Sequence, residues 1–488
     1  MFVRRTSAFC RREHLPLGWE EGMGLPTRRT FLMGLAATGG IALQGCSAPV
    51  TGGSESADLA GSEGNSNAGP MDLQVAWDTL LLYEGITTDD TEQPLSVLRS
   101  NFVFSASNML AIGDRVYVGA GGTVFGFTPE TGEVAHQFSV VDSDEEDPVG
   151  DIMSIAASQD VMYAATSGGY VVAFDVASGA QLWATLCCST RSPGITSWGG
   201  GETLYFSDAP WRCTSLAMGS TAIVVGYSSY QLENMSLLAC VEASTGVARW
   251  TRQLEGRLDT AGGLGYPVAV DAGLLLPMPD GSGLGLLGMQ TGETLDFLET
   301  DSPIYMGLTM SDEGGLPCYF QSKLGTLYKV DVENGALVAA IAQDACTDSV
   351  KRVPSGARPL LADGRVIVNA ATQDEDAKRF DGDYNPSAGE CVVFDAETLE
   401  VLERHDAPEI ESTPVRMGEG MYYLGRAGIY YAALEGGVPG EPELVIDAEG
   451  RDRDVWEQQL LAADGMLYFV GGPYGERWLY AIGPADEV

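Results

Sequence analysis

Short segments in which apolar residues recur at every second position fill the chain from residue 71 onward, with glycine-rich turns between them. This period of two is the signature of β-strands that have one face buried. The same order of strand, turn, strand, Thr-Gly or Asn-Gly turn and strand returns along the chain. Its copies begin at Gly113, Gln159, Gly219, Asp271, Gly314, Asp363, Gly418 and Asp464.

A further strand precedes each copy, as at Ser412–Arg416 and Gln459–Ala462, so every unit is a four-stranded antiparallel sheet. Where the spacing is regular, the turn glycines lie 46 residues apart (Gly246 to Gly292) and 43 apart (Gly292 to Gly335). Four-stranded units of this length form β-propellers. The sequence therefore predicts an all-β, eight-bladed propeller over residues 71–488. The last unit has only three strands, and we expect Leu73–Thr79 to supply its outer strand and close the ring.

Two units share a distinctive turn: an acidic residue, a small residue and Thr-Gly or Ser-Gly, with tryptophan four positions after the glycine. They contain Asp175, Gly179 and Trp183, and Glu242, Gly246 and Trp250. This pattern resembles the pyrroloquinoline-quinone-type (PQQ-like) repeat of the quinoprotein alcohol dehydrogenase-like superfamily. The resemblance covers roughly residues 71–488 and implies the propeller fold. Its tryptophans are expected to be structural, packed between neighbouring blades.

The repeat is interrupted twice. Gly179 and Gly246 are 67 residues apart, and the excess lies in Ala184–Arg212, where Ile195–Trp198 and Thr203–Phe206 predict an extra hairpin. A second insertion, Ala371–Gly389, joins two strands of the sixth unit. Connections between blades and those between a blade's second and third strands emerge on one face, so both insertions are expected at one mouth of the channel. Loops on a rigid scaffold commonly carry binding sites.

The first insertion contains the adjacent pair Cys187-Cys188. In quinoprotein methanol and alcohol dehydrogenases, adjacent cysteines form a disulfide ring that stacks on the quinone, so the resemblance implies a PQQ site here. The pair follows Trp183 more closely than in that family. The sequence favours the alternative, in which the cysteines are buried thiols or pair elsewhere, for example with Cys213 or Cys240. Seven cysteines follow Cys46, so at least one has no disulfide partner within the chain.

The second insertion contains Asp381, Asp383 and Asn385, at the alternate spacing by which short loops of oxygen ligands wrap calcium. Pro386 and Val392 stand where an EF-hand needs glycine and glutamate. A similar acidic run occupies Asp142–Asp147. The sequence favours solvated acidic loops over a calcium site.

The first 45 residues predict a twin-arginine export signal. Arg28 and Arg29 precede an apolar stretch, and Leu43-Gln44-Gly45-Cys46 resembles a lipobox, with Cys46 as the lipidated residue. Met23 is expected to be the true start. Residues 46–70 are predicted to be a flexible tether. The mature chain is thus expected outside the cytoplasm, anchored to the membrane as a lipoprotein.

Charge excludes one class of partner. The chain carries 27 Lys and Arg against 68 Asp and Glu, a formal net charge of −41, which repels nucleic acids. The three histidines and the absence of a Cys-x-x-Cys-His motif argue against a histidine-rich metal centre and a covalently attached haem.

Three functions stay open at this point. The first is a non-catalytic binding or scaffold module, a monomeric propeller with a protein or small-ligand partner at the channel-mouth loops. Its layout is similar to the propeller lipoprotein of the outer-membrane barrel assembly machinery. The second is a PQQ- and calcium-dependent dehydrogenase, for which neither a catalytic aspartate nor calcium ligands can be placed. The third is a calcium-stabilised binding module. The sequence favours the first.

Overall fold

A computed structural model describes part of the chain, all of it between residues 73 and 484, as follows: 73–83, 94–95, 106–141, 149–158, 160–188, 191–198, 201–208, 211–213, 216–229, 235–256, 267–311, 315–342, 351–352, 358–372, 389–408, 412–425, 428–447, 460–472 and 476–484. These residues form strands and turns and contain no helix, and so no helix that could cross a membrane. The predicted signal and tether lie outside the described residues.

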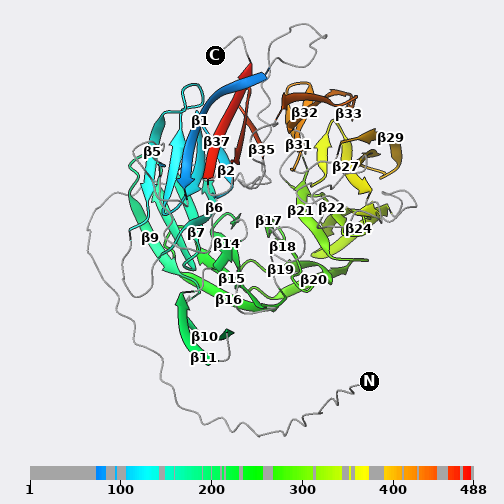
Figure 1. The fold of residues 1–488 in the computed structure, drawn as a ribbon. Helices are drawn as coiled ribbons and strands as arrows, with labels where there is room; N and C mark the ends of the chain where they lie inside the picture. The colour runs from blue at the N-terminus through cyan, green and yellow to red at the C-terminus, as the bar shows by residue number, and fades with distance from the viewer. Residues whose placement is uncertain are drawn as a thin grey trace, which may run out of the picture. The chain divides into compact units, whose positions relative to one another are not determined.

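The described strands form nine antiparallel sheets: eight follow one another along the chain as the blades of the propeller (Figure 1), and the ninth is a separate two-stranded hairpin. Blades 1 and 2 comprise β2 (Met109–Ile112), β3 (Arg115–Ala120), β4 (Thr123–Phe127) and β5 (Val134–Ser139), then β6 (Ile152–Ser158), β7 (Val161–Thr166), β8 (Tyr170–Asp175) and β9 (Gln181–Leu186). Blades 3 and 4 comprise β12 (Trp211–Cys213), β13 (Ala217–Met218), β14 (Ala222–Ser229), β15 (Met235–Glu242) and β16 (Ala248–Glu255), then β17 (Val268–Val270), β18 (Gly273–Pro277), β19 (Gly283–Leu287) and β20 (Thr294–Glu299).

Blades 5 and 6 comprise β21 (Ile304–Met310), β22 (Cys318–Ser322), β23 (Leu327–Glu333) and β24 (Ala336–Ala342), then β25 (Lys351–Arg352), β26 (Leu360–Ala362), β27 (Arg365–Thr372), β28 (Gly389–Asp395) and β29 (Val401–Ala407). Blade 7 comprises β30 (Val415–Met417), β31 (Gly420–Gly425), β32 (Gly428–Glu435), β33 (Val438–Pro439) and β34 (Glu443–Asp447). Blade 8 comprises β35 (Leu460–Ala463), β36 (Met466–Gly471), β37 (Glu476–Pro484) and the N-terminal strand β1 (Leu73–Tyr83).

Strand β1 closes the propeller as the sequence predicts. It pairs antiparallel with β37, from Leu73 opposite Pro484 to Tyr83 opposite Glu476. Eight hydrophobic clusters fill the spaces between blades, one for each consecutive pair and one between blades 8 and 1, where Leu82 packs with Val118. Every blade is therefore covered on both faces. The predicted eight-bladed, all-β propeller is confirmed.

The tryptophans of the repeat are structural, as expected. Trp183 of blade 2 lies on the turn glycine of blade 3, Gly246, so closely that an added Cβ would come within 2.6 Å of the indole ring. Trp250 covers Gly292 in the same way, and Trp77 of β1 covers Gly132. Each tryptophan thus joins the outer strand of one blade to the outer turn of the next.

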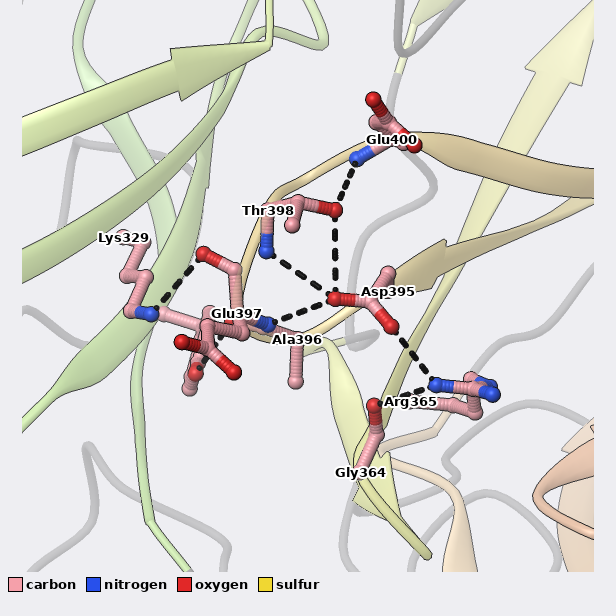
Figure 2. A network of polar contacts seen from close by, with 9 residues as sticks. Lys329, Gly364, Arg365, Asp395, Ala396, Glu397, Thr398 and Glu400 are labelled. Atoms are coloured by element: carbon pink, nitrogen blue, oxygen red, sulfur yellow. Dashed lines mark hydrogen bonds and ion pairs between the residues drawn. The ribbon is translucent and has the colours of Figure 1, made fainter.

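The acidic residue of the repeat holds the same turn in shape. In blade 6, Asp395 Oδ1 accepts hydrogen bonds from the backbone N–H groups of Glu397 and Thr398, at 3.1 and 3.0 Å (Figure 2). Its Oδ2 pairs with Arg365 of β27 at 2.8 Å, and Lys329 of blade 5 donates to the Glu397 carbonyl at 3.1 Å. Asp175 caps the corresponding turn of blade 2 by accepting from Ser178. The motif that predicted the fold is therefore a turn-capping and blade-joining device.

Candidate functional site

The junction between blades 2 and 3 holds the largest described departure from the repeat. Strands β10 (Arg191–Trp198) and β11 (Gly201–Asp208) form the predicted hairpin, which is longer at both ends than the sequence indicated. They pair with each other, from Arg191 opposite Asp208 to Trp198 opposite Gly201, and with no other described strand. The insertion is thus an arm attached to the propeller rather than a fifth strand of a blade.

Cys187 and Cys188 lie at the base of this arm, immediately after β9. Both backbone N–H groups donate to the carbonyl of Gly169, at 2.9 and 3.2 Å. Gly169 adopts a φ of +83°, and an added Cβ would collide with the Cys188 backbone carbonyl. The turn between β7 and β8 therefore needs glycine at this position so that the cysteine pair can pack against it.

The pair meets a third cysteine across the blade junction. Cys188 and Cys213, which are 7% and 4% exposed, belong to the hydrophobic cluster between blades 2 and 3 together with the fully buried Tyr227. The Cys213 thiol donates to the Thr166 carbonyl at 3.3 Å. The Tyr227 hydroxyl donates to the Tyr170 carbonyl at 3.0 Å. The cysteines are thus part of the packing that joins two blades.

All six cysteines in the described residues are free thiols: Cys187, Cys188, Cys213, Cys240, Cys318 and Cys391. The disulfides considered for Cys187 and Cys188 with Cys213 or Cys240 are therefore absent, and the buried-thiol alternative describes this site. Burial raises the pKa of Cys187 to about 12 and raises the pKa values of Cys188 and Cys213 as well. Burial therefore disfavours the thiolate, which is the nucleophilic form of cysteine.

The placement of these cysteines differs from the quinone platform that the resemblance implied. A stacking platform needs an accessible ring of joined cysteines, whereas here Cys188 is a core residue and both thiols are free. Nor is a basic cradle assembled from the described side chains. Arg358 is half-buried and donates to the Thr413 hydroxyl and the Leu308 carbonyl, at 3.4 and 3.5 Å. The side chains of Arg191, Arg212 and Arg352 lie outside the described part. Quinone binding at Cys187 and Cys188 stays a prediction.

The calcium loop is not described: Asp381, Asp383 and Asn385, like the acidic run Asp142–Asp147, fall outside the described residues. Calcium binding therefore also stays a prediction. Within the described part of the chain, no group of three or more His, Cys, Asp or Glu side chains is placed to hold a metal ion. The topology does put the two insertions at the same ends of their strands, because one follows β9 and the other joins β27 to β28.

Sequence reasoning missed Tyr227 and Gly169, which complete the junction. Tyr227 is one apolar residue among many in β14, and only the neighbouring blade brings it to the cysteines. Gly169 belongs to a Gly-Gly turn, Gly168-Gly169, which predicts a hairpin but does not predict what packs on it.

Comparison with known proteins supports the fold. Residues 100–192 match the family model of the outer membrane protein assembly factor BamB. No curated protein sequence matches the chain significantly. Among solved structures, a europium-containing methanol dehydrogenase is 12% identical with a TM-score of 0.51, over 85% of this chain and 93% of that chain.

The quinohemoprotein alcohol dehydrogenase ADHIIG from Pseudomonas putida is 11% identical with a TM-score of 0.50, over 85% of this chain and 76% of that chain. BamB from Moraxella catarrhalis is 17% identical with a TM-score of 0.38, over 65% of this chain and 81% of that chain, a score too low to argue from. At these identities the similarity establishes a PQQ-like propeller fold and leaves the activity open.

Proposed function

We propose that this protein is an exported lipoprotein whose propeller is a non-catalytic binding or scaffold module at the cell envelope. The family-model match to an outer membrane assembly factor supports an envelope location. The export signal at Arg28 and Arg29 and the lipidation site at Cys46 support a membrane anchor. The partner is a protein or a small ligand at the channel-mouth loops, and nucleic acid is excluded by charge.

One observation carries the proposal: the β10–β11 hairpin is built onto the propeller without joining any described blade. An isolated two-stranded hairpin is marginally stable in water, so an arm of this length is a natural candidate for stabilisation by a partner. Beside it, the cysteines that would serve a dehydrogenase are packed into the blade junction. These two observations support a binding function for this site.

A crosslinking experiment tests this function. A photoreactive amino acid replaces Trp198 at the tip of the hairpin, and the control carries it in place of Val247, an exposed residue in the turn between β15 and β16 of blade 3. We expect the tip, and not the control position, to crosslink a defined partner in intact cells. The Cys46→Ala variant should lose both the membrane anchor and that crosslink. Equal crosslinking from both positions would contradict a specific arm.

The dehydrogenase alternative, which the fold similarity motivates, has its own test. Purified residues 47–488 are titrated with PQQ in the presence of calcium, and quenching of tryptophan fluorescence is measured. The Cys187→Ser/Cys188→Ser variant is the control. Saturable quenching that the variant loses would overturn the non-catalytic proposal. No quenching by PQQ would leave the binding function in place.

A further inference from the structure

The junction between blades 6 and 7 contains a second group of polar side chains, separate from the cysteine pair. Asn369 of β27, Cys391 of β28 and His405 of β29 are directly opposite one another in the sheet of blade 6. Their side chains therefore share the face toward blade 7, where Tyr423 of β31 packs in the same hydrophobic cluster as Cys391. Asn369, Cys391 and Tyr423 are 3%, 1% and 0% exposed. A thiol, an imidazole and a phenol thus lie side by side in a packed interior.

Three buried polar atoms of this group make no hydrogen bond to any described residue. They are Nδ1 and Nε2 of His405 and the hydroxyl of Tyr423. Burial raises the pKa of Tyr423, and the neighbouring Cys391 raises it further, which places the hydroxyl near the thiol. Buried polar groups in native proteins almost always have a partner, because an unpaired one is costly. Three unpaired atoms in one junction therefore call for a bound species that pairs with them.

We propose that this junction binds Cu(I), with Cys391 Sγ and His405 Nε2 as its two ligands. Thiolate sulfur and imidazole nitrogen both suit copper, and soft Cu(I) accepts two ligands in a line. Two ligands suffice, although no group of three or more His, Cys, Asp or Glu in the described residues is placed to hold a metal ion. Opposed residues of neighbouring strands have Cβ atoms about 4.5–5.5 Å apart. This spacing suits a bridge of about 4.3 Å, built from metal–sulfur and metal–nitrogen bonds of about 2.3 and 2.0 Å.

The charge of the site selects this ion. When the metal binds, the Cys391 thiol releases its proton to solvent and its sulfur bonds to the copper, and nothing is oxidised or reduced. Cu(I), a thiolate and a neutral imidazole sum to zero charge. Zn²⁺ would need a further anionic ligand, because a net charge buried without a partner is strongly disfavoured. Burial raises the pKa of Cys391 to about 12, so its thiolate forms only together with a cation that replaces the proton.

The same arrangement provides a partner for each of the three unpaired atoms. Nε2 of His405 binds the metal, and the Tyr423 hydroxyl donates to the Cys391 sulfur. Nδ1 of His405 lies 4.0 Å from Glu403 Oε1, so a small rotation of the ring brings Nδ1–H into hydrogen bonding with this carboxylate. Carboxylates commonly orient metal-bound imidazoles in this way. The His405 side chain is 22% exposed on the outer strand of blade 6, which gives the ion an entry path. The site does not depend on the proposed envelope function or on the hairpin.

Nuclear magnetic resonance of residues 47–488, isotopically labelled at the histidine ring nitrogens, tests the proposal. This part of the chain contains all eight blades and only two histidines, His136 and His405. His136 is an internal control, because its Nδ1 already pairs with the Tyr117 hydroxyl at 2.7 Å in blade 1. We expect Cu(I), added without oxygen, to shift one ring-nitrogen resonance of His405 saturably and to leave both resonances of His136 in place.

Matched variants identify the other ligand. Cys391→Ser should abolish the His405 shift. Cys318→Ser removes an equally buried thiol whose opposite residues are Met310 and Val330, so it should keep the shift. Glu403→Gln, which changes a half-exposed side chain, should weaken Cu(I) binding about 10–100-fold when bicinchoninate competes for the metal. Circular dichroism confirms that each variant is folded.

Three results would overturn the proposal. The first is a His405 resonance that Cu(I) never moves, which would leave the unpaired atoms to bound water alone. The second is a shift of the same size in Cys391→Ser, because the thiol would then not be a ligand. The third is a His405 shift produced by Zn²⁺ at lower concentrations than by Cu(I), because the charge argument would then have selected the wrong ion.

Discussion

At the scale of single residues, the turn glycines of the repeat meet two separate requirements. Gly246 has a φ of +70°, which disfavours any other residue, and an added Cβ would also strike Trp183. Gly335 has a φ of +80°, but an added Cβ there would meet nothing within 4 Å. Substitutions at these two positions therefore distinguish the cost of backbone strain from the cost of disturbed packing between blades.

Gly335→Ala should lower the free energy of unfolding by about 1–2 kcal/mol through the left-handed backbone alone. Gly246→Ala should lower it further, by about another 1–3 kcal/mol, because the methyl group displaces the Trp183 ring. Chemical denaturation followed by circular dichroism measures both. Equal losses in the two variants would show that the tryptophan does not join blades 2 and 3 as described.

The capping aspartate Asp395 makes part of the stability depend on pH. Its pKa is lowered, first by the hydrogen bond from the Thr398 N–H, with the bond from Glu397 and the nearby Arg365 also contributing. The folded state thus binds this proton less tightly than the unfolded state. The contribution of the Asp395 carboxylate to the free energy of unfolding is therefore complete above the ordinary aspartate pKa of about 3.9. It is lost as the pH falls through the lower pKa that Asp395 has in the folded protein.

Asp395→Asn should consequently be less stable than the wild type at pH 7, and the difference should shrink as the pH falls below about 4. Denaturation midpoints measured across this range give the result. A difference for Asp395→Asn that is constant with pH would contradict the capping role.

At the scale of elements, β1 determines whether the ring is closed. Leu81 and Leu82 of β1 are fully buried, and Leu82 belongs to the cluster that joins blade 8 to blade 1. Leu82→Ala should lower the free energy of unfolding by about 2–5 kcal/mol, although the residue lies at one end of the described chain. Leu295→Ala, at a leucine that is 53% exposed, should change it by less than about 0.5 kcal/mol.

Unfolding monitored by tryptophan fluorescence measures both variants. A Leu82→Ala variant as stable as the wild type would mean that the ring does not depend on β1.

The β10–β11 hairpin is the opposite kind of element, because it pairs with no described blade. Its sequence alternation predicted the hairpin, but its independence from blades 2 and 3 could be known only from the strand pairing.

At the scale of the whole molecule, the sequence by itself determined the number of blades, the strand order and the closing strand. Alternation and turn glycines are local signals, and eight copies of one local pattern leave few arrangements that bury every sheet face. The paired tryptophan and glycine of neighbouring units, Trp183 with Gly246, belong to the same pattern.

The tertiary structure alone decided which side chains from different units meet. Cys187 and Cys188 pack between blades 2 and 3 because their backbone N–H groups donate to Gly169 of blade 2. Cys213 and Tyr227 of blade 3 belong to the same hydrophobic cluster. A period of two shows which residues share a face of a strand. The environment of that face depends on the segment that packs against it, and the alternation along one strand does not identify that segment.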